Sequence, residues 1–198
     1  GEPLPAEPGP DRGVVFQRYS VFPHLTVLGN VLLGKELRAA RLSARLFGAA
    51  RRQAVEEARS MIASVGLSGS EDKYPAQLSG GMQQRLALAQ ALVMRPKVLL
   101  LDEPFGALDA FTREELWCVI RDLHAAQGVT IVLVTHDLRE AVFLADRIFV
   151  MSARPGRVVK EHTVPFARPR DIDLMYDGAF NDMVHVLHGE IAKARVVA

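Results

Sequence analysis

The segment VLLLDEPFGALDA, residues 98–110, decides how the rest of the chain is interpreted. Its first four residues are apolar, which is typical of a buried strand, and they run directly into Asp102 and Glu103. Open sheets that alternate strands with helices bind ligands at the carboxyl ends of their strands. Two carboxylates there suit phosphoryl transfer, in which one holds Mg²⁺ and the other positions the attacking water. Taken alone, an acidic pair that merely begins a loop is an equally good interpretation.

Strands and helices alternate after this first strand. The predicted elements are a strand over Val98–Leu101, a helix over Thr112–Gln127, a strand over Thr130–Val134, a helix over Leu138–Ala145 and a strand over Arg147–Met151. This order predicts an α/β fold with a mostly parallel sheet. For the first of the two helices, Thr112 and Glu115 form a predicted capping box, and Gly128 is the predicted end.

The part of the chain before this strand is predicted to be mainly helical. Prolines and glycines among residues 1–12 predict an extended surface segment, and Gly13–Phe16 is a predicted short strand. From Leu25 to Val65 the apolar residues follow helical spacing, and Gly66 is the predicted stop.

A second chemically informative stretch is LSGGMQ, residues 78–83, at the start of a helix predicted from Ser79 to a point before Pro96. Gly80 and Gly81 let a ligand approach the backbone, and the free N–H groups of a helix start favour phosphate. On its own, the stretch fits a simple capped turn better.

Together these stretches resemble the motifs of the ABC (ATP-binding-cassette) ATPases, in that family's order. Residues 78–83 look like the signature, Leu99–Glu103 like a Walker B strand, and Gly106–Ala110 like the D-loop. Gln17 is similar to the Q-loop glutamine and His136 to the switch histidine. The resemblance implies a P-loop NTPase-like α/β fold, with a mostly parallel sheet and an inserted α-helical subdomain.

The resemblance also implies ATP and Mg²⁺ as cofactors and a role for each motif residue. The implied catalytic residues are Glu103, His136 and Gln17; the nucleotide-binding residues are Ser79, Gly80, Gly81, Gln83 and Asp109; the Mg²⁺ ligands are Asp102 and Gln17. The implied parts are an extended segment (1–12), a core strand end with the Q-loop (13–24), a helical subdomain (25–95), a RecA-like core (96–164) and a carboxyl-terminal tail and helix (165–198).

Within the family, residues 9–17 and 102–113 look like the nitrate, sulfonate and taurine importers. This implies a homodimeric ATPase that couples ATP hydrolysis to uptake of a small anion through transmembrane permease subunits, served by a periplasmic solute-binding protein. Tyr19, Phe22 and Leu25 are the expected apolar contacts with the permease. Two alternatives remain: a truncated or degenerate cassette that acts as a non-hydrolysing binding module, and a non-transport ABC ATPase.

One stretch approaches a phosphate-binding P-loop, residues 29–36, but it ends in Glu36 where a P-loop has a Ser or Thr. It also follows Gln17, whereas the family's P-loop precedes the Q-loop, so we interpret it as helix. We therefore expect these 198 residues to lack the Walker A segment, which would precede them. We expect them to be inactive toward MgATP by themselves, although the full-length protein is an ATPase.

Composition limits the remaining possibilities. A formal net charge of +1 argues against a nucleic-acid partner. Apolar stretches such as Val129–Val134 are far shorter than the roughly 20 residues that cross a bilayer, which predicts a cytoplasmic protein held on the inner membrane face by its permease. Cys118 is interpreted as packing, and His185 and His188 as a solvated face rather than a metal site.

Overall fold

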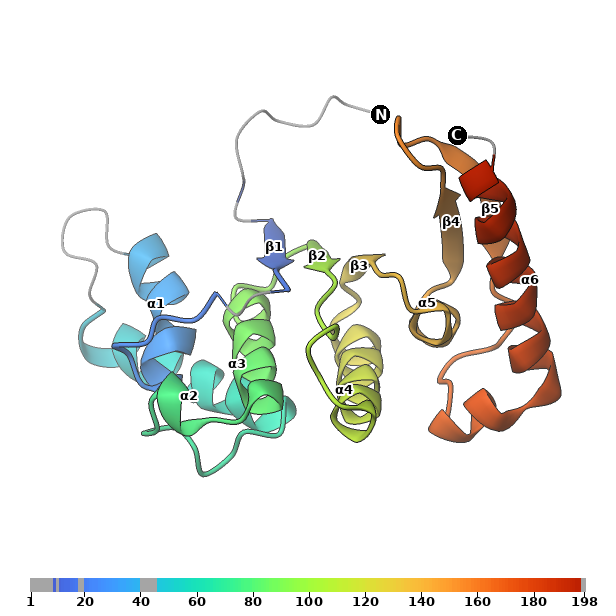
Figure 1. Ribbon diagram of the computed structural model, residues 1–198. Coiled ribbons are helices and arrows are strands. Elements are labelled where there is room, and N and C mark those ends of the chain that lie inside the picture. Colours follow the sequence, from blue (N-terminus) through green and yellow to red (C-terminus); the bar gives the residue numbers. More distant parts are fainter. Residues whose placement is uncertain (1–8, 10, 18–19, 40–45, 197–198) are drawn as a thin grey trace. The chain divides into compact units, whose positions relative to one another are not determined.

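The computed structural model describes residue 9 and residues 11–17, 20–39 and 46–196 (Figure 1). The chain forms two compact units, an N-terminal unit of residues 1–134 and a C-terminal unit of residues 135–198. Each unit is described by itself below. The five-part division predicted from the sequence stays a prediction.

A three-stranded parallel sheet lies in the N-terminal unit. Its strands, in spatial order, are β1 (Arg12–Val15), β2 (Val98–Asp102) and β3 (Thr130–Val134). Val15 pairs with Leu101, and Asp102 pairs with Val134. Val15, Leu99 and Leu101 are each only 1% exposed, so alternate side chains of these strands enter the core. The strands confirm the prediction, except that β1 begins and ends one residue early and β2 continues one residue further, to Asp102.

The helical elements of this unit are α1 (Val27–Ala39), α2 (Gly48–Ser64), the 3-10 turn η1 (Pro75–Gln77), α3 (Gly80–Leu92) and α4 (Ala110–Gln127). Helix α3 lies at the centre, because it contacts α1, α2, α4 and β1 (Figure 1). Leu86, Leu88 and Leu92 are each at most 1% exposed. The other helices therefore depend on α3 for a surface on which to bury their apolar faces.

Helix ends confirm the prediction at some positions and correct it at others. Gly66 has a φ of +74° directly after the α2 cap, as a helix stop requires. The predicted capping box of Thr112 and Glu115 is wrong, because the helix begins earlier, at Ala110. Asp109 is its cap: the Asp109 carboxylate accepts the Thr112 N–H at 3.0 Å and the Thr112 hydroxyl at 2.7 Å.

The C-terminal unit combines two strands and two helices. Its elements are α5 (Leu138–Leu144), β4 (Arg147–Met151), β5 (Val158–Thr163), the 3-10 turn η2 (Ile172–Tyr176) and α6 (Gly178–Val196). Strand β4 confirms the prediction but pairs antiparallel with β5, which the sequence did not predict. His185 and His188 are both exposed on α6, as expected for a solvated face. No helix among the described residues is long and apolar enough to span a membrane.

Asn30 fixes the entry into α1. Its side chain is fully buried and accepts the Phe22 N–H at 2.7 Å. The amide nitrogen donates to the carbonyls of Phe22, Leu25 and Thr26 at 3.0–3.1 Å. Asn30→Ala should lower the free energy of unfolding by about 2–3 kcal/mol, because it leaves buried backbone groups without partners. Urea unfolding measures this loss.

The matched control is Ser64→Ala on α2, where an exposed hydroxyl bonds to a carbonyl three residues back. This change should alter stability by less than about 0.5 kcal/mol. Equal losses in the Asn30 and Ser64 variants would contradict the role assigned to Asn30.

Candidate functional site

The carboxyl edge of the parallel sheet carries the two acidic residues singled out in the sequence. Asp102 is the last residue of β2 and is exposed, and Glu103 follows it half-buried. The Glu103 N–H donates to the Val134 carbonyl at 2.9 Å, and the Gly106 N–H donates back to the Glu103 carbonyl at 3.3 Å. Glu103 has a φ of +44°, a left-handed conformation that costs a non-glycine residue roughly 1–2 kcal/mol. The backbone of Glu103, the first residue of the turn after β2, is thus held by two hydrogen bonds in a left-handed conformation.

Gln17 reaches the same edge from the neighbouring strand. It lies two residues beyond Val15, and Val15 is the register partner of Leu101 in β2. A Cβ placed on Gly106 would lie 3.5 Å from the Gln17 amide nitrogen and 3.7 Å from the Glu103 carbonyl oxygen. The structure therefore brings Gln17 beside the turn that begins at Glu103, at the sheet edge where Asp102 ends β2. Their catalytic and metal-binding roles stay predictions.

The oxygen atoms at this edge fit Mg²⁺. Asp102 offers an exposed carboxylate and Gln17 a side-chain carbonyl, both hard oxygen ligands. Within the part of the chain that the structure describes, no cluster of three or more His, Cys, Asp or Glu side chains could hold a metal. Mg²⁺ commonly binds through only one or two carboxylates together with water and substrate phosphates, so a sparse ligand set is sufficient.

The signature stretch forms the first turn of α3. Ser79 caps the helix, since its hydroxyl accepts the Met82 N–H at 3.3 Å. Ser79 and Gly80 are exposed, which leaves the helix start accessible to an anion. Gln83 is engaged within its own loop, because its amide donates to the carbonyls of Pro75 at 3.0 Å and Leu78 at 3.3 Å. Its predicted contact with nucleotide stays a prediction.

Gly81, in the first turn of α3, allows a close contact between α3 and α4. A Cβ placed on Gly81 would lie 2.3 Å from the Thr112 methyl carbon. Thr112 cannot turn away freely, because Asp109 binds both its N–H and its hydroxyl. The same bonds lower the pKa of Asp109, the Thr112 N–H first and the Thr112 hydroxyl second. The sequence did not predict that Thr112 packs against Gly81. The glycine itself was the available signal, because a residue without a side chain leaves room for a neighbouring helix.

A further link between these helices comes from Arg85. Its guanidinium donates to the Val65 carbonyl at 3.0 Å and to the Glu115 carboxylate at 2.8 Å. One side chain in the middle of α3 therefore holds the carboxyl end of α2 and the amino-terminal half of α4.

His136 belongs to the C-terminal unit and is exposed. The next residue, Asp137, caps α5 by accepting the N–H groups of Arg139 at 2.9 Å and Glu140 at 3.2 Å. The Thr135 hydroxyl accepts the Asp137 N–H at 2.9 Å. His136 is thus held between two hydrogen-bonded residues at the start of α5, and its switch role stays a prediction.

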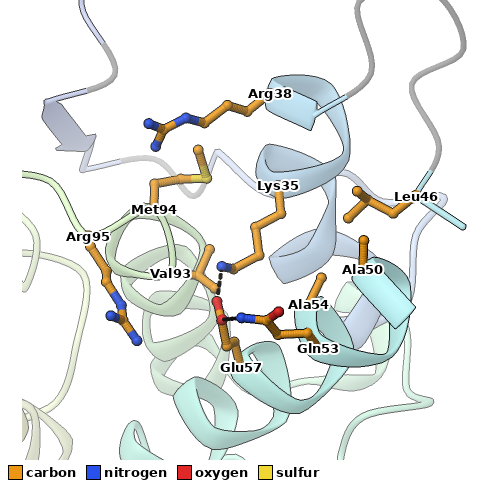
Figure 2. Close-up of a pocket in the computed structure, with 10 residues that line it drawn as sticks. All are labelled: Lys35, Arg38, Leu46, Ala50, Gln53, Ala54, Glu57, Val93, Met94 and Arg95. Atoms are coloured by element: carbon orange, nitrogen blue, oxygen red, sulfur yellow. Dashed lines mark hydrogen bonds and ion pairs between the residues drawn. The ribbon is translucent and has the colours of Figure 1, made fainter. Parts of the chain in front are cut away.

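A second site is a cavity of about 610 Å³ formed by α1, α2 and residues just after α3 (Figure 2). Its lining residues are Lys35, Arg38, Leu46, Ala50, Gln53, Ala54, Glu57, Val93, Met94 and Arg95. Lys35 forms an ion pair with Glu57, and Gln53 donates to the same carboxylate at 3.0 Å. The Lys35 hydrogen bond is the main cause that lowers the pKa of Glu57, followed by that of Gln53. With three cations and one carboxylate, the cavity favours an acidic ligand with an apolar part.

The decoy P-loop at residues 29–36 lies inside α1, and not in a loop after a strand. Its interpretation as helix is confirmed. Gly34 packs against Met94, whose sulfur would lie 3.0 Å from an added Cβ, so this glycine serves the contact between α1 and the end of α3.

Gly81→Ala tests the junction with Thr112. The added methyl group has no room, and we expect a net loss of about 1 kcal/mol in the free energy of unfolding, after allowance for the helix propensity of alanine. Thr112→Ser removes the methyl carbon that is in the way but keeps the hydroxyl bond to Asp109. The double variant should therefore regain most of the loss in urea unfolding. If Thr112→Ser gives no recovery, the packing argument is wrong.

The comparisons with known proteins agree with this geometry. The ABC transporter family matches residues 6–106. The bicarbonate transport ATP-binding protein CmpD of Synechocystis sp. is 45% identical over 174 residues, which cover 87% of this chain and 59% of the relative. The aliphatic sulfonates import ATP-binding protein SsuB of Bacillus licheniformis is 47% identical over 165 residues, 82% of this chain and 60% of the relative. The chain thus spans about three fifths of the length of the curated relatives it matches.

A solved structure is similar as well. It is a dimeric post-hydrolysis state of the ATP-binding cassette MJ0796 bound to ADP and Pi, with 32% identity and a TM-score of 0.64, covering 79% of this chain and 64% of that one. This similarity confirms the predicted α/β fold of the P-loop NTPase class. On the family match and the motifs described above, the chain belongs to the ABC transporter family.

Proposed function

We propose that this protein is the ATP-hydrolysing subunit of an importer, where it couples ATP hydrolysis to solute uptake through a membrane permease. The observation that carries the proposal is the sheet edge at which Gln17 lies beside the turn that follows Asp102 and Glu103. A module that binds MgATP without catalysis would need the Mg²⁺ ligands Asp102 and Gln17, but it would not need the carboxylate of Glu103. The names of the relatives CmpD and SsuB support the assignment to transport.

Each candidate residue has a distinct part in the proposed reaction. Asp102 and Gln17 would hold Mg²⁺, which would supply positive charge to neutralise the phosphates of ATP. Glu103 orients and polarises the attacking water, and His136 contacts the terminal phosphate. Ser79 and Gly80 at the exposed start of α3 contact the nucleotide held by a second copy of the subunit. The dimeric form of the similar cassette supports such a pairing.

The transported solute in this proposal is a small anion. Relatives of this chain are named for bicarbonate, nitrate, aliphatic sulfonates and taurine. The permease and a periplasmic solute-binding protein choose among such solutes, while the ATPase remains at the cytoplasmic face of the membrane.

Permease docking is proposed for the basic cavity between α1 and α2. The occupant is a cytoplasmic permease segment that carries an acidic side chain beside an apolar one. Arg38 and Arg95 flank the cavity, while Val93 and Met94 supply apolar surface (Figure 2). Phe22, which is exposed before α1, is a further expected contact with the permease; Tyr19 lies outside the described residues.

Glu103→Gln in the full-length protein tests the reaction. ATP binding should remain within about twofold of wild type, while turnover should fall by at least about 100-fold, because the amide cannot act as a general base. Steady-state hydrolysis and nucleotide titration measure both quantities. Glu56→Gln, an exposed change on α2, is the control and should leave both unchanged. Hydrolysis near the wild-type rate in the Glu103 variant would refute the assignment.

Reversing charge at the cavity tests permease docking. The double variant Arg38→Glu, Arg95→Glu should weaken assembly with the permease by at least about tenfold, because an acidic segment would meet like charge. ATP hydrolysis by the isolated subunit should persist, since neither arginine lies at the sheet edge. Arg59→Glu on the exposed face of α2 is the control. Unchanged permease binding, measured by co-purification from detergent, would exclude this cavity as the docking surface.

A further inference from the structure

Helix α5 is too short to be stable without contacts to the rest of its unit. It has seven residues, and isolated helices of fewer than about 12 residues are marginal in water. Asp137, which follows His136 directly, is the N-cap of α5, and its carboxylate accepts N–H groups of the first turn. The location of the His136 backbone therefore depends on the side chains that anchor α5 within the C-terminal unit.

Arg170 anchors the carboxyl end of α5. It is only 3% exposed although it carries a formal charge. Its guanidinium donates to four carbonyl oxygens, those of Val142 (3.3 Å), Phe143 (2.9 Å), Ala145 (2.7 Å) and Phe166 (3.1 Å). The first three belong to the end of α5, where carbonyls have no partner within the helix and where a positive charge is favoured by the helix dipole. Arg170, which lies more than 20 residues further along the chain, thus caps the carboxyl end of α5 with its side chain.

Electrostatics support a fixed guanidinium at this position. Burial lowers the pKa of Arg170 first and the nearby Arg168 second, while Asp146, at 3.5 Å, raises it. The group still stays charged at neutral pH, as arginine does in proteins. A charge held away from water in this way must keep its acceptors, because losing them would leave it buried without compensation.

The amino end of α5 is anchored to the same carboxyl-terminal segment. Arg139 donates to the Met175 carbonyl at 2.8 Å and to the Asn181 side chain at 3.5 Å. Its guanidinium also lies 5.7 Å from the centre of the Phe180 ring, a cation–π distance. With both ends tied to residues 166–181, α5 cannot slide or rotate unless several of these bonds break.

We propose that Arg170 is a positioning residue for His136: by capping α5 it fixes the orientation in which the imidazole is presented for ATP hydrolysis. The proposal rests on the function proposed above, in which His136 contacts the terminal phosphate. Arg170 itself touches no reacting atom. In this proposal its effect on the reaction passes through α5 and His136.

A double-mutant cycle in the full-length subunit assembled with its permease tests this dependence. Arg170→Met should lower kcat at least about tenfold and leave KM for ATP within about twofold, because only presentation of the imidazole is lost. In a His136→Ala background the same change should lower kcat by less than about twofold. Arg147→Met is the matched control, since Arg147 pairs with Glu161 on the exposed β4–β5 ribbon and should leave kcat unchanged.

Arg170→Lys keeps the variant testable if the methionine form does not fold. Lysine retains the charge but not the planar fork, so it cannot reach all four carbonyls, and kcat should fall about threefold. Independent effects of the lysine change and His136→Ala, whose fold-losses multiply, would overturn the proposal. So would a wild-type kcat in either Arg170 variant.

Amide hydrogen exchange gives a readout that does not need ATPase activity. Residues 138–144 should exchange at least about tenfold faster in Arg170→Lys than in Arg147→Met, because α5 loses its carboxyl-terminal anchor. Unchanged exchange there would overturn the proposal. A wild-type transporter without ATPase activity would instead refute the proposed function, while the exchange measurement would still decide whether Arg170 holds α5.

Discussion

The register of three parallel strands is the constraint on which the candidate site depends. Because β1, β2 and β3 run in the same direction, their carboxyl ends meet at one edge. Residues almost 90 positions apart in the chain, Gln17 and Glu103, become neighbours through that register alone. A shift of one residue in the pairing of β1 would turn Val15 from the core to the other face. Burial of Val15 and Leu101 therefore fixes the geometry of polar groups that contribute nothing to the core.

Helix α3 connects the two surfaces for which a partner is proposed. Its amino end carries the signature residues, and the residues just after its carboxyl end, Val93 to Arg95, line the basic cavity. A helix of 13 residues is about 20 Å long and is stiff when buried on most sides. A permease segment in the cavity and a nucleotide at the signature would thus contact opposite ends of the same buried helix. Arg85 adds α2 and α4 to this assembly midway along it.

The sequence predicted much of this fold because its strongest signals are local. The apolar run before Asp102 and the glycine after the α4 residues marked element ends that the structure confirms. The capping box failed because Asp109 and Thr112 both offer a side-chain oxygen, and only the fold decides which one faces the free N–H groups. Strand β5 was missed because every residue except His162 is exposed, so no apolar alternation marks it.

Glu103 illustrates how chemistry and stability can conflict at one residue. The turn after β2 requires a backbone conformation that glycine adopts without penalty and glutamate does not. A chain selected for stability alone would place glycine there. The left-handed backbone at Glu103 is thus an observation that supports the proposed role of its carboxylate. Under the proposed function, glycine at this position would relieve the strained backbone and remove hydrolysis at the same time.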